Sequence, residues 1–382
     1  MFYAKFEKKM MNLAINEAVS YHYDKFPPGK LDYHLFIQEI LKATDALARF
    51  DQVLKNLHNN EILLAPLRNQ EAVISSRIEG TISTMDEILQ YEADEDQQNA
   101  NVNVRPDVVE TILYQRALKN AQKGLTDGYE ISASFIKMMH QQLLFYGRGA
   151  AKSPGQFKIE QNYLADKVKR KINFIPISPE KLTDGLGTLF TYLKESNDPV
   201  LVKTALMHLE FEALHPFQDG NGRIGRMLIT LFLWKEKVLS QPHFYISGYF
   251  EEHKDLYIDT MREVSRTGEW ENWIRFFLTA VEKQATKNLA IAESIKDLYE
   301  EMKTTFSELL SSKWSLTTLD FMFTNPVFRN NKFTTSSGIP PGTAAGFTKK
   351  LLDAGYLVSK QDAAGRRPAL YSFEPLMRLV RI

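Results

Sequence analysis

The sequence of 382 residues contains no cysteine, which excludes disulfide bonds, a thiolate nucleophile and cysteine-ligated zinc. It also lacks a long hydrophobic run. The longest, from Met227 to Trp234, is far shorter than the roughly 20 apolar residues that span a bilayer. The first residues mix lysines with apolar side chains and show no apolar stretch of a signal peptide. We therefore expect a cytoplasmic protein without a membrane role.

A net charge is missing as well, because 47 Lys and Arg balance 47 Asp and Glu. The balance is uneven along the chain. Residues 314–382 hold nine Lys or Arg and four Asp or Glu, so this segment is basic and the remainder is acidic. Such an asymmetry indicates that the C-terminal segment has a role of its own.

Helical periodicity dominates the sequence and predicts a mainly α fold. Residues 35–57 and 62–79 each place apolar side chains at helical spacing on one face. The acidic and amide-rich residues 90–103 predict a surface loop, and residues 283–310 predict a long amphipathic helix. Glycines, prolines and a short alternating stretch at 172–176 predict a loop with a small hairpin.

The last segment has the order helix, helix and β-ribbon, which is typical of a winged helix-turn-helix. Residues 343–352 are the predicted recognition helix, and Arg366 and Arg367 lie at the predicted tip of the ribbon. Cations there are able to contact DNA phosphates, but few polar residues on 343–352 suit base edges. We favour a protein contact for this segment, with DNA binding as the alternative.

The segment from His215 to Arg226 is denser in chemically active residues than any other. Pro216 disfavours helix at His215, and the apolar spacing that follows predicts a new helix. The N–H groups at a helix start bind anions, and glycines let a phosphate approach the backbone. Arg223 and Arg226 lie on one side of that first turn, where two cations make sense beside an anion.

Two further side chains complete a predicted phosphate site. Asp219 is able to hold Mg²⁺ on phosphate oxygens, and His215 supplies a side chain of the type that can titrate near neutral pH. A base, a metal ligand, an anion cradle and two arginines suit in-line phosphoryl or nucleotidyl transfer. One alternative is a glycine-rich turn with solvated arginines. Another is a zinc site made of His208, Glu212 and His215, which would leave the glycine turn without a role.

The stretch HPFQDGNGRIGR resembles the HxFx(D/E)GNGRxxR motif of Fic proteins and fills every position of it. The likeness extends to LAPLRNQEAVISSRIEGTISTMDEIL before the motif and to ISGYFEEHKDLYIDTMREVSRTGEWENWIRFFL after it. A mild departure is Lys158, which stands where arginine is common. The resemblance implies an N-terminal helical region over 1–115 with an inhibitory helix at 62–79. It also implies a Fic helical core with a β-hairpin flap over 116–285, and a linker helix with a winged helix over 286–382.

The resemblance implies a protein adenylyltransferase, which moves AMP from ATP to a Tyr, Thr or Ser hydroxyl of a target protein. His215 would be the general base, and Asp219 would hold Mg²⁺ on the α- and β-phosphates. Arg223 would contact the inner phosphates and Arg226 the γ-phosphate, while Phe217 would anchor the loop. The other nucleotide-binding residues that it implies are Gly220, Asn221, Gly222, Ile224 and Gly225.

The stretch Ile172-Asn173-Phe174-Ile175 corresponds to the flap of such enzymes. We expect a target segment to add to it as a strand, which would place a hydroxyl over His215; a simple covering turn is the alternative. Tyr249, His253 and Tyr257 resemble the rim of the nucleotide site. Many relatives carry asparagine at the position of His253, and core packing is an equal alternative for Tyr249.

The stretch SSRIEG matches the inhibitory motif (S/T)xxxE(G/N) of the family through Ser75, Glu79 and Gly80. A glutamate at the end of a helix faces the negative end of the helix dipole, which is unfavourable by roughly 0.3–1 kcal/mol. The resemblance supplies a partner for it, because a charge-assisted bond to Arg226 would keep that arginine from the γ-phosphate. We therefore expect self-inhibition, with a solvated surface glutamate as the alternative.

The expected partners are ATP, Mg²⁺ and a protein with a modifiable hydroxyl. Modification of the chain itself and a homodimer stay open. So do two other functions. One is an enzyme with the same site that removes AMP from a modified protein or uses another phosphate donor. The other is a DNA-binding regulator whose catalytic core is subsidiary.

Overall fold

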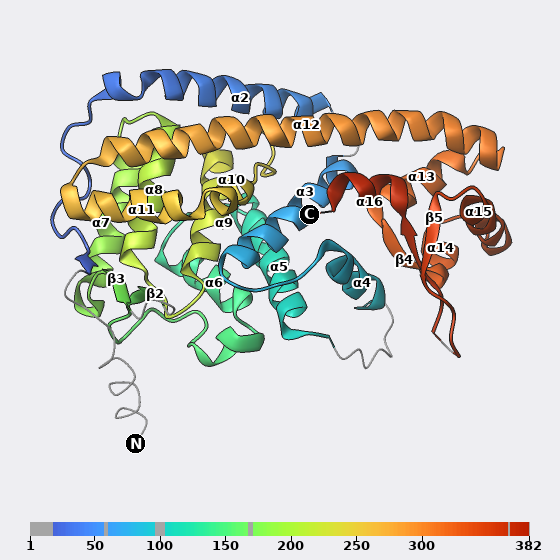
Figure 1. The fold of residues 1–382 in the computed structure, drawn as a ribbon, viewed down its shortest axis with the longest axis horizontal. Helices are drawn as coiled ribbons and strands as arrows, with labels where there is room; N and C mark the ends of the chain where they lie inside the picture. Colours follow the sequence, from blue (N-terminus) through green and yellow to red (C-terminus); the bar gives the residue numbers. More distant parts are fainter. Residues whose placement is uncertain (1–17, 57–59, 96–103, 167–170, 366, 382) are drawn as a thin grey trace. The chain divides into compact units, whose positions relative to one another are not determined.

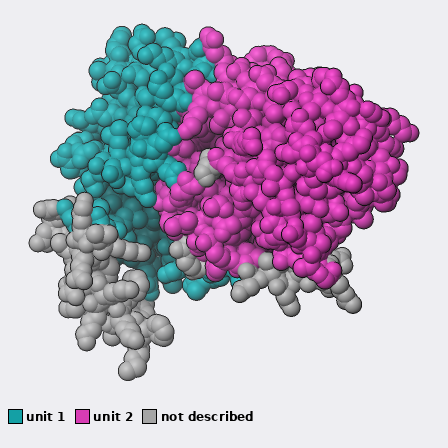
Figure 2. Space-filling view, turned by 45° about the vertical axis from the view of Figure 1, so that its right-hand side comes forward, with its two compact units in different colours: residues 1–46, 116–242, 249–283 teal, residues 47–115, 243–248, 284–382 magenta. Residues whose placement is uncertain are grey.

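The computed structural model describes residues 18–56, 60–95, 104–166, 171–365 and 367–381. The chain forms two compact units (Figure 2). The first unit consists of Met1–Ala46, Arg116–Pro242 and Tyr249–Lys283, and the second of Leu47–Gln115, His243–Gly248 and Gln284–Ile382. Helices dominate both units (Figure 1), so the predicted mainly α fold is confirmed. Among the described residues, no helix is long and apolar enough to cross a bilayer.

The first unit is built around two neighbouring helices, α8 (Val200–Leu214) and α9 (Asn221–Lys235), which pack against each other (Figure 1). Nearly every side chain of both helices is buried, which makes them core helices. α7 packs on α8, and α6 packs on α9. The surrounding elements are α6 (Ala133–Leu143), α7 (Leu182–Glu195), α11 (Lys254–Thr267), η1 (Tyr33–Leu35), η2 (Gly147–Ala151) and η3 (Pro179–Lys181).

Three short strands form a sheet in the first unit, in the order β1-β3-β2. They are β1 (Val19–Ser20), β2 (Leu164–Asp166) and β3 (Lys171–Ile175). β3 pairs antiparallel with β2, which confirms the predicted hairpin; the intervening residues 167–170 lie outside the described residues. β3 also pairs in parallel with β1, which the sequence does not predict.

A buried polar cluster anchors the segment that follows β1. The Tyr21 hydroxyl donates to Glu210 Oε1 at 2.5 Å, and His22 Nε2 lies 2.8 Å from Glu210 Oε2. The other ring nitrogen of His22 lies 2.7 Å from Ser265 Oγ on α11. Burial and the neighbouring Glu210 carboxylate raise the pKa of Tyr21 above its ordinary value. These hydrogen bonds hold the residues that directly follow β1 against α8.

The second unit joins an N-terminal helix pair to the C-terminal segment. The pair is α3 (Asn60–Ile78) and α4 (Met85–Glu95), and α13 and α16 pack on α3 while strand β4 packs on α4. The C-terminal sheet has the order β4-β6-β5. Its elements are α13 (Ser315–Thr324), β4 (Val327–Arg329), α14 (Asn330–Ser336), α15 (Pro341–Asp353), β5 (Leu357–Gln361), β6 (Leu370–Phe373) and α16 (Glu374–Val380).

The C-terminal segment contains the two predicted helices, α13 and α15, and the predicted β-ribbon, β5 with β6, and α15 contains the predicted recognition helix. Strand β4 and helix α14, which the sequence does not predict, lie between α13 and α15. Its assignment as a winged helix stays a prediction. Arg367 pairs with Asp94 on α4 at 3.0 Å, so this predicted ribbon-tip cation is engaged within the unit. Arg366 lies outside the described residues.

Two predictions about local structure are wrong. The acidic run does not begin a loop at residue 90, because α4 continues to Glu95; the rest of the predicted loop, residues 96–103, lies outside the described residues. Asp94 of α4 is only 4% exposed and accepts a 2.7 Å hydrogen bond from Arg329 Nε, so a contact with a strand distant in the sequence keeps the Asp94 side chain buried.

The second wrong prediction is the start of the long helix α12 (Trp270–Leu310). It starts 13 residues earlier than the predicted 283, because Trp273, Ile274 and Phe277 continue its buried face. Four helices contribute to both units, namely α2 (Ile37–Asn56), α5 (Pro106–Thr126), α10 (Ser247–Glu252) and α12.

Candidate functional site

His215 ends α8 in an unusual backbone conformation. Its φ is 45°, in the left-handed region that residues other than glycine rarely adopt. Pro216 follows directly and disfavours the helical conformation at His215. The ring Nδ1 lies 3.3 Å from the carbonyl oxygen of Glu212, which can only accept, so Nδ1 carries the proton of the neutral ring. The basic lone pair of the neutral imidazole is therefore on Nε2.

The loop after His215 is held tightly to the start of α9. Asn221 accepts from the Phe217 N–H at 2.9 Å through its Oδ1 and donates to the Phe217 carbonyl at 2.8 Å. Phe217 is completely buried, which confirms its expected place in the core. Gly220 closes the loop with a φ of 78°, a conformation that glycine adopts without strain. These contacts fix the backbone conformation between His215 and the N-terminus of α9.

His140 on α6 packs against this loop, and no pattern in the sequence predicts this contact. Its ring stacks on Phe217 with the ring centres 3.8 Å apart. Nδ1 accepts from the Gly155 N–H at 2.8 Å, and Nε2 donates to the Asp219 carbonyl at 3.0 Å. Burial lowers the pKa of His140 to about 4, so at neutral pH the ring keeps one donor and one acceptor. Both are used.

The first two turns of α9 carry two buried cations. Arg223 is 3% exposed and Arg226 is 1% exposed. Both lie at the helix end whose free N–H groups already give it partial positive charge. Burial, and to a smaller extent the charge of Arg226, lowers the pKa of the neighbouring His208 to about 3. This concentration of positive charge suits an anion with several negative oxygens.

Asp219 is the residue in this segment that is able to hold a divalent cation. Its side chain is 44% exposed, Oδ1 accepts from the Gly220 N–H at 2.6 Å, and Oδ1 lies 3.6 Å from Arg223 Nη2. A single carboxylate fits Mg²⁺, which commonly binds through one carboxylate plus substrate phosphates. The zinc alternative finds no support, because no group of three metal-ligating side chains occurs in the part of the chain that the structure describes.

Gly225 allows α8 and α9 to approach closely at the site. A Cβ atom at this position would lie 2.4 Å from Glu212 Oε1 and 3.2 Å from His208 Nδ1. Both side chains come from α8, the helix that ends at His215. Glycine at this motif position therefore sets the spacing between the two helices that carry His215 and Arg226.

We expect Gly225→Ala to destabilise the chain by about 1–3 kcal/mol, because the added methyl group overfills the α8–α9 contact. Gly187→Ala on α7 is the matched control, since a Cβ atom there would meet nothing within 4 Å. The control is expected to stabilise by about 0.5–1 kcal/mol through helix propensity. Urea denaturation followed by tryptophan fluorescence measures both. Equal stability of the two variants would contradict the close-approach argument.

The three predicted rim residues differ in their surroundings. Tyr249 stacks on His253 with ring centres 4.0 Å apart, and both are partly exposed. Burial raises the pKa of Tyr249. Tyr257 is 3% exposed, and its hydroxyl lies 2.7 Å from Nε2 of the fully buried His208. Their nucleotide contacts stay predictions. Tyr257 in addition has a clear structural role beneath α8.

The predicted flap residues form strand β3. Ile172 and Phe174 point to the buried side, and Asn173 and Ile175 are half-buried, as alternation in a strand requires. Val19 and Ser20 of β1 pair with Phe174 and Ile175 on one edge, and β2 occupies the other. Addition of a target strand to β3 stays a prediction. On the β1 edge it would run beside residues 171–173 or displace β1.

The predicted inhibitory motif ends α3 in a well-defined turn of the second unit. The Gly80 N–H bonds to the Arg77 carbonyl and the Thr81 N–H to the Ser76 carbonyl, with a φ of 85° at Gly80. This is a Schellman motif, which explains the glycine. Ser75 is fully buried, while Glu79 is exposed. Glu79 belongs to the second unit and Arg226 to the first, and the pairing of their side chains stays a prediction.

Helix α3 is held by buried polar contacts within its unit. Glu71 accepts from the Tyr114 hydroxyl at 3.0 Å and from the Ser247 hydroxyl at 2.5 Å. Gln70 donates to the Val380 carbonyl of α16 at 2.9 Å. Since unsatisfied buried polar groups are costly, these contacts define one position of α3 within the unit.

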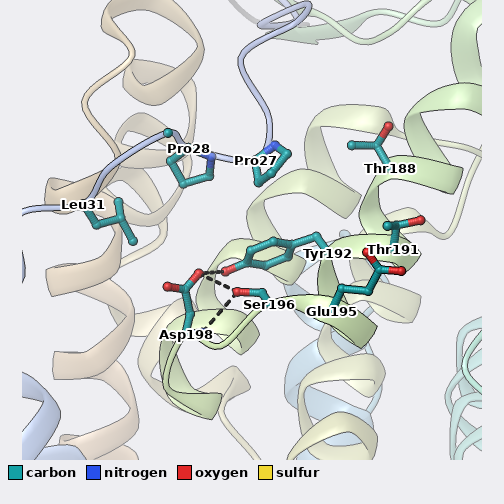
Figure 3. Close-up of a pocket in the computed structure, with 10 residues that line it drawn as sticks. Pro27, Pro28, Leu31, Thr188, Thr191, Tyr192, Glu195, Ser196 and Asp198 are labelled. Carbon is teal, nitrogen blue, oxygen red and sulfur yellow. Dashed lines mark hydrogen bonds between the residues drawn. The ribbon is translucent and has the colours of Figure 1, made fainter.

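An open cavity of about 600 Å³ lies elsewhere in the first unit, between residues 27–31 and the end of α7 (Figure 3). Asp198 faces it and accepts hydrogen bonds from Tyr192 at 2.6 Å and Ser196 at 2.9 Å. Glu195 also lines it, and the described lining residues include no lysine or arginine. This acidic cavity does not suit a triphosphate, in contrast to the start of α9.

The sequence matches two related family descriptions. Residues 37–123 match the Fic/DOC family N-terminal region, and residues 130–233 match the Fic/DOC family. The second span contains all residues from His215 to Arg226, and the first contains Ser75, Glu79 and Gly80. Together the two spans cover half of the chain.

Curated relatives carry the name of an activity. A probable protein adenylyltransferase of Aquifex aeolicus is 27% identical over 210 residues, which are 53% of this chain and 57% of that protein. The protein adenylyltransferase fic-1 of Caenorhabditis elegans is 30% identical over 110 residues, which are 28% of this chain and 20% of that protein. The chain thus spans less than two thirds of the length of each.

Solved structures share the fold at low sequence identity. A Fic family protein from Desulfovibrio desulfuricans aligns with a TM-score of 0.58 at 16% identity and covers 91% of this chain and 98% of its own. A Fic-domain signalling protein from Bacteroides thetaiotaomicron aligns with a TM-score of 0.53 at 16% identity, over 67% of this chain and 97% of its own. At such identities the likeness establishes the fold.

Proposed function

Because the chain belongs to the Fic/DOC family, we propose that it is a protein adenylyltransferase, which transfers AMP from ATP to a Tyr, Thr or Ser hydroxyl of a protein. The names of the curated relatives support this reaction class. The observation that carries it is the junction of α8 and α9. There a histidine with its basic lone pair on Nε2 is followed, within eleven residues, by a helix start with two buried arginines.

The reaction follows from these groups. The hydroxyl oxygen of the target attacks the α-phosphorus, the bond to the β-phosphate oxygen breaks, and pyrophosphate leaves. His215 Nε2 takes the hydroxyl proton as general base. The N–H groups of the Gly220-Asn221-Gly222 turn hold phosphate oxygens, and Arg223 and Arg226 bind the inner and terminal phosphates. The chain thereby holds the α-phosphorus in line with the attacking oxygen.

Asp219 would hold Mg²⁺, which when bound neutralises charge on the phosphate oxygens. Glu79 would restrain the reaction. Its carboxylate would bind the Arg226 guanidinium, so that ATP would bind with its α-phosphate misplaced for attack. The target segment would add to the flap beside β3, and His253 with Tyr249 would border the adenine. The basic C-terminal segment would contact a protein partner.

Labelled ATP tests the proposed reaction. We expect label at the α-phosphate to be transferred to the chain itself or to a protein of a cell lysate, and label at the γ-phosphate to leave as pyrophosphate. His215→Ala is expected to lower transfer by roughly 10²–10⁴-fold, the usual contribution of a general base. His34→Ala, at an exposed histidine of the same unit, is the control.

Transfer of the γ-label, or equal transfer by the His215→Ala and parent chains, would overturn the proposal. Loss of AMP from a previously modified protein, without transfer from ATP, would instead assign the reverse reaction to this site. The measurements are made on the parent chain and on a chain with Glu79→Gly, so that self-inhibition does not hide the activity.

A further inference from the structure

Four consecutive carbonyl oxygens around His215 are held by two residues from a distant loop. Lys158 donates from Nζ to the Leu214 carbonyl at 3.0 Å and from its backbone N–H to the Pro216 carbonyl at 2.8 Å. Asn162 donates from Nδ2 to the carbonyls of His215 and Phe217, each at 3.0 Å. Lys158 Nζ also donates to Asn162 Oδ1 at 2.9 Å, which couples the two side chains.

These contacts provide hydrogen-bond donors for backbone carbonyls that have no partner within α8. Leu214 is the last residue of α8 and residues 215–217 follow it, so the carbonyls of these four residues have no partners in the α8 ladder. His215 in addition adopts the left-handed conformation, which costs a residue with a Cβ atom roughly 1–2 kcal/mol. Such a conformation persists only where the surroundings impose it. The pair of Lys158 and Asn162 supplies that constraint on both sides of His215.

Lys158 is buried, so its ammonium group loses hydration that the ammonium group of a surface lysine keeps. It is 3% exposed, and burial lowers its pKa to about 7. Its ammonium lies at the C-terminal end of α8, where the helix dipole favours a cation. The two arginines proposed to bind phosphate lie on α9, whereas Lys158 contacts the carbonyls on either side of His215.

We propose that Lys158 and Asn162 are positioning residues, which hold the backbone of His215 so that its Nε2 meets the attacking hydroxyl. The proposal rests on the proposed function and adds to it two residues that lie outside the motif. Neither residue would touch the reacting atoms. Both act through the carbonyls that flank His215.

The main test replaces Lys158 by methionine, which keeps the length of the side chain and removes its donors. In the full chain carrying Glu79→Gly, we expect Lys158→Met to lower kcat for AMP transfer by about 100-fold, the effect of a displacement near 1 Å. The KM for ATP is expected to change less than threefold, because the arginines and the helix start are untouched. Lys158→Arg, which restores a donor, is expected to keep kcat within tenfold of the parent.

The matched control is Lys203→Met in the same unit. Lys203 is 7% exposed and donates to the Leu193 carbonyl at 3.4 Å, so it also caps a helix end from a buried position. This variant is expected to lose stability without a change in kcat. A kcat for Lys158→Met within threefold of the parent, or a loss of kcat as large in Lys203→Met, would overturn the proposal.

Asn162→Asp is the second variant, for the case that Lys158→Met does not fold. It keeps the shape of the side chain and its acceptor for Lys158, and removes the donor to the His215 and Phe217 carbonyls. The same fall in kcat is expected. An Asn162→Asp chain that folds and retains parental kcat would also overturn the proposal.

A spectroscopic readout separates this proposal from the proposed function. Nitrogen-15 NMR of the histidine rings, assigned with His215→Gln, is expected to show the Nδ1–H tautomer of His215 in the parent and averaged tautomers in both variants. If no chain transfers AMP, the proposed function fails while this signature still decides the positioning role. An unchanged tautomer in Lys158→Met and Asn162→Asp would contradict that role.

Discussion

Replacement of Glu79 by glycine is expected to raise AMP transfer by about 10- to 100-fold. Hydrogen bonds to charged groups contribute roughly 1.5–3 kcal/mol, and about 1.4 kcal/mol corresponds to a factor of ten. Loss of the Glu79 carboxylate would therefore release Arg226 for the terminal phosphate of ATP. The measurement is the initial rate of label transfer from α-labelled ATP, for the parent and the variant at equal concentration.

Two further variants separate the lost charge from changes in the turn. Glu79→Ala removes the same carboxylate without added backbone freedom, and we expect it to activate as much as Glu79→Gly. Combination of Glu79→Gly with Arg226→Ala is expected to abolish the gain, because the proposal assigns the terminal phosphate of ATP to the released arginine. A Glu79→Gly rate equal to that of the parent would refute the self-inhibition.

Asp94→Ala is expected to destabilise the second unit by about 3–5 kcal/mol, the usual effect of leaving a buried charge without its partner. Asp94 accepts from Arg329 Nε at 2.7 Å, and the Arg329 side chain is 1% exposed. Removal of the carboxylate leaves the buried guanidinium with neutral acceptors, the Pro368 carbonyl and Gln361 Oε1. Urea denaturation at neutral pH measures the change.

The second arginine on Asp94 supplies the control for this experiment. The Arg367 side chain is 48% exposed, so its ion pair is screened by water. We expect Arg367→Ala to cost at most about 1 kcal/mol. Asp94→Ala combined with Arg329→Met is expected to recover most of the lost stability, because no buried charge remains. A loss below 1 kcal/mol for Asp94→Ala alone would show that α4 does not depend on this pair.

Asp94 also illustrates where prediction from the sequence ends. Its neighbours are acidic and polar, so local composition favours a solvated loop. The side chain is buried only because Arg329, 235 residues later, lies on a strand that packs against α4. The capping box at the start of α4 is local, in contrast. Thr84 and Glu87 exchange hydrogen bonds there, three residues apart.

The same division applies to the candidate site. The residues from His215 to Arg226 are contiguous, and their spacing predicts a turn that feeds a helix start, as the structure confirms. The loop that contains Lys158 and Asn162 has neither helical nor strand periodicity, and His140 lies on an ordinary amphipathic helix. Nothing in the spacing of these three residues points to the segment from Leu214 to Asp219 that they contact. Their contacts join positions 53 to 79 residues apart.

The sequence by itself determined the mainly helical fold, the break at Pro216, the glycine turn that leads into α9 and the glycine turn at the end of α3. Each of these follows from backbone preferences and side-chain spacing within about ten residues. The tertiary structure alone decided which groups hold the His215 backbone, that β1 completes the flap sheet, and that α4 continues through its acidic end. Those outcomes depend on buried polar groups finding partners far along the chain, and such partners are chosen by packing rather than by local sequence.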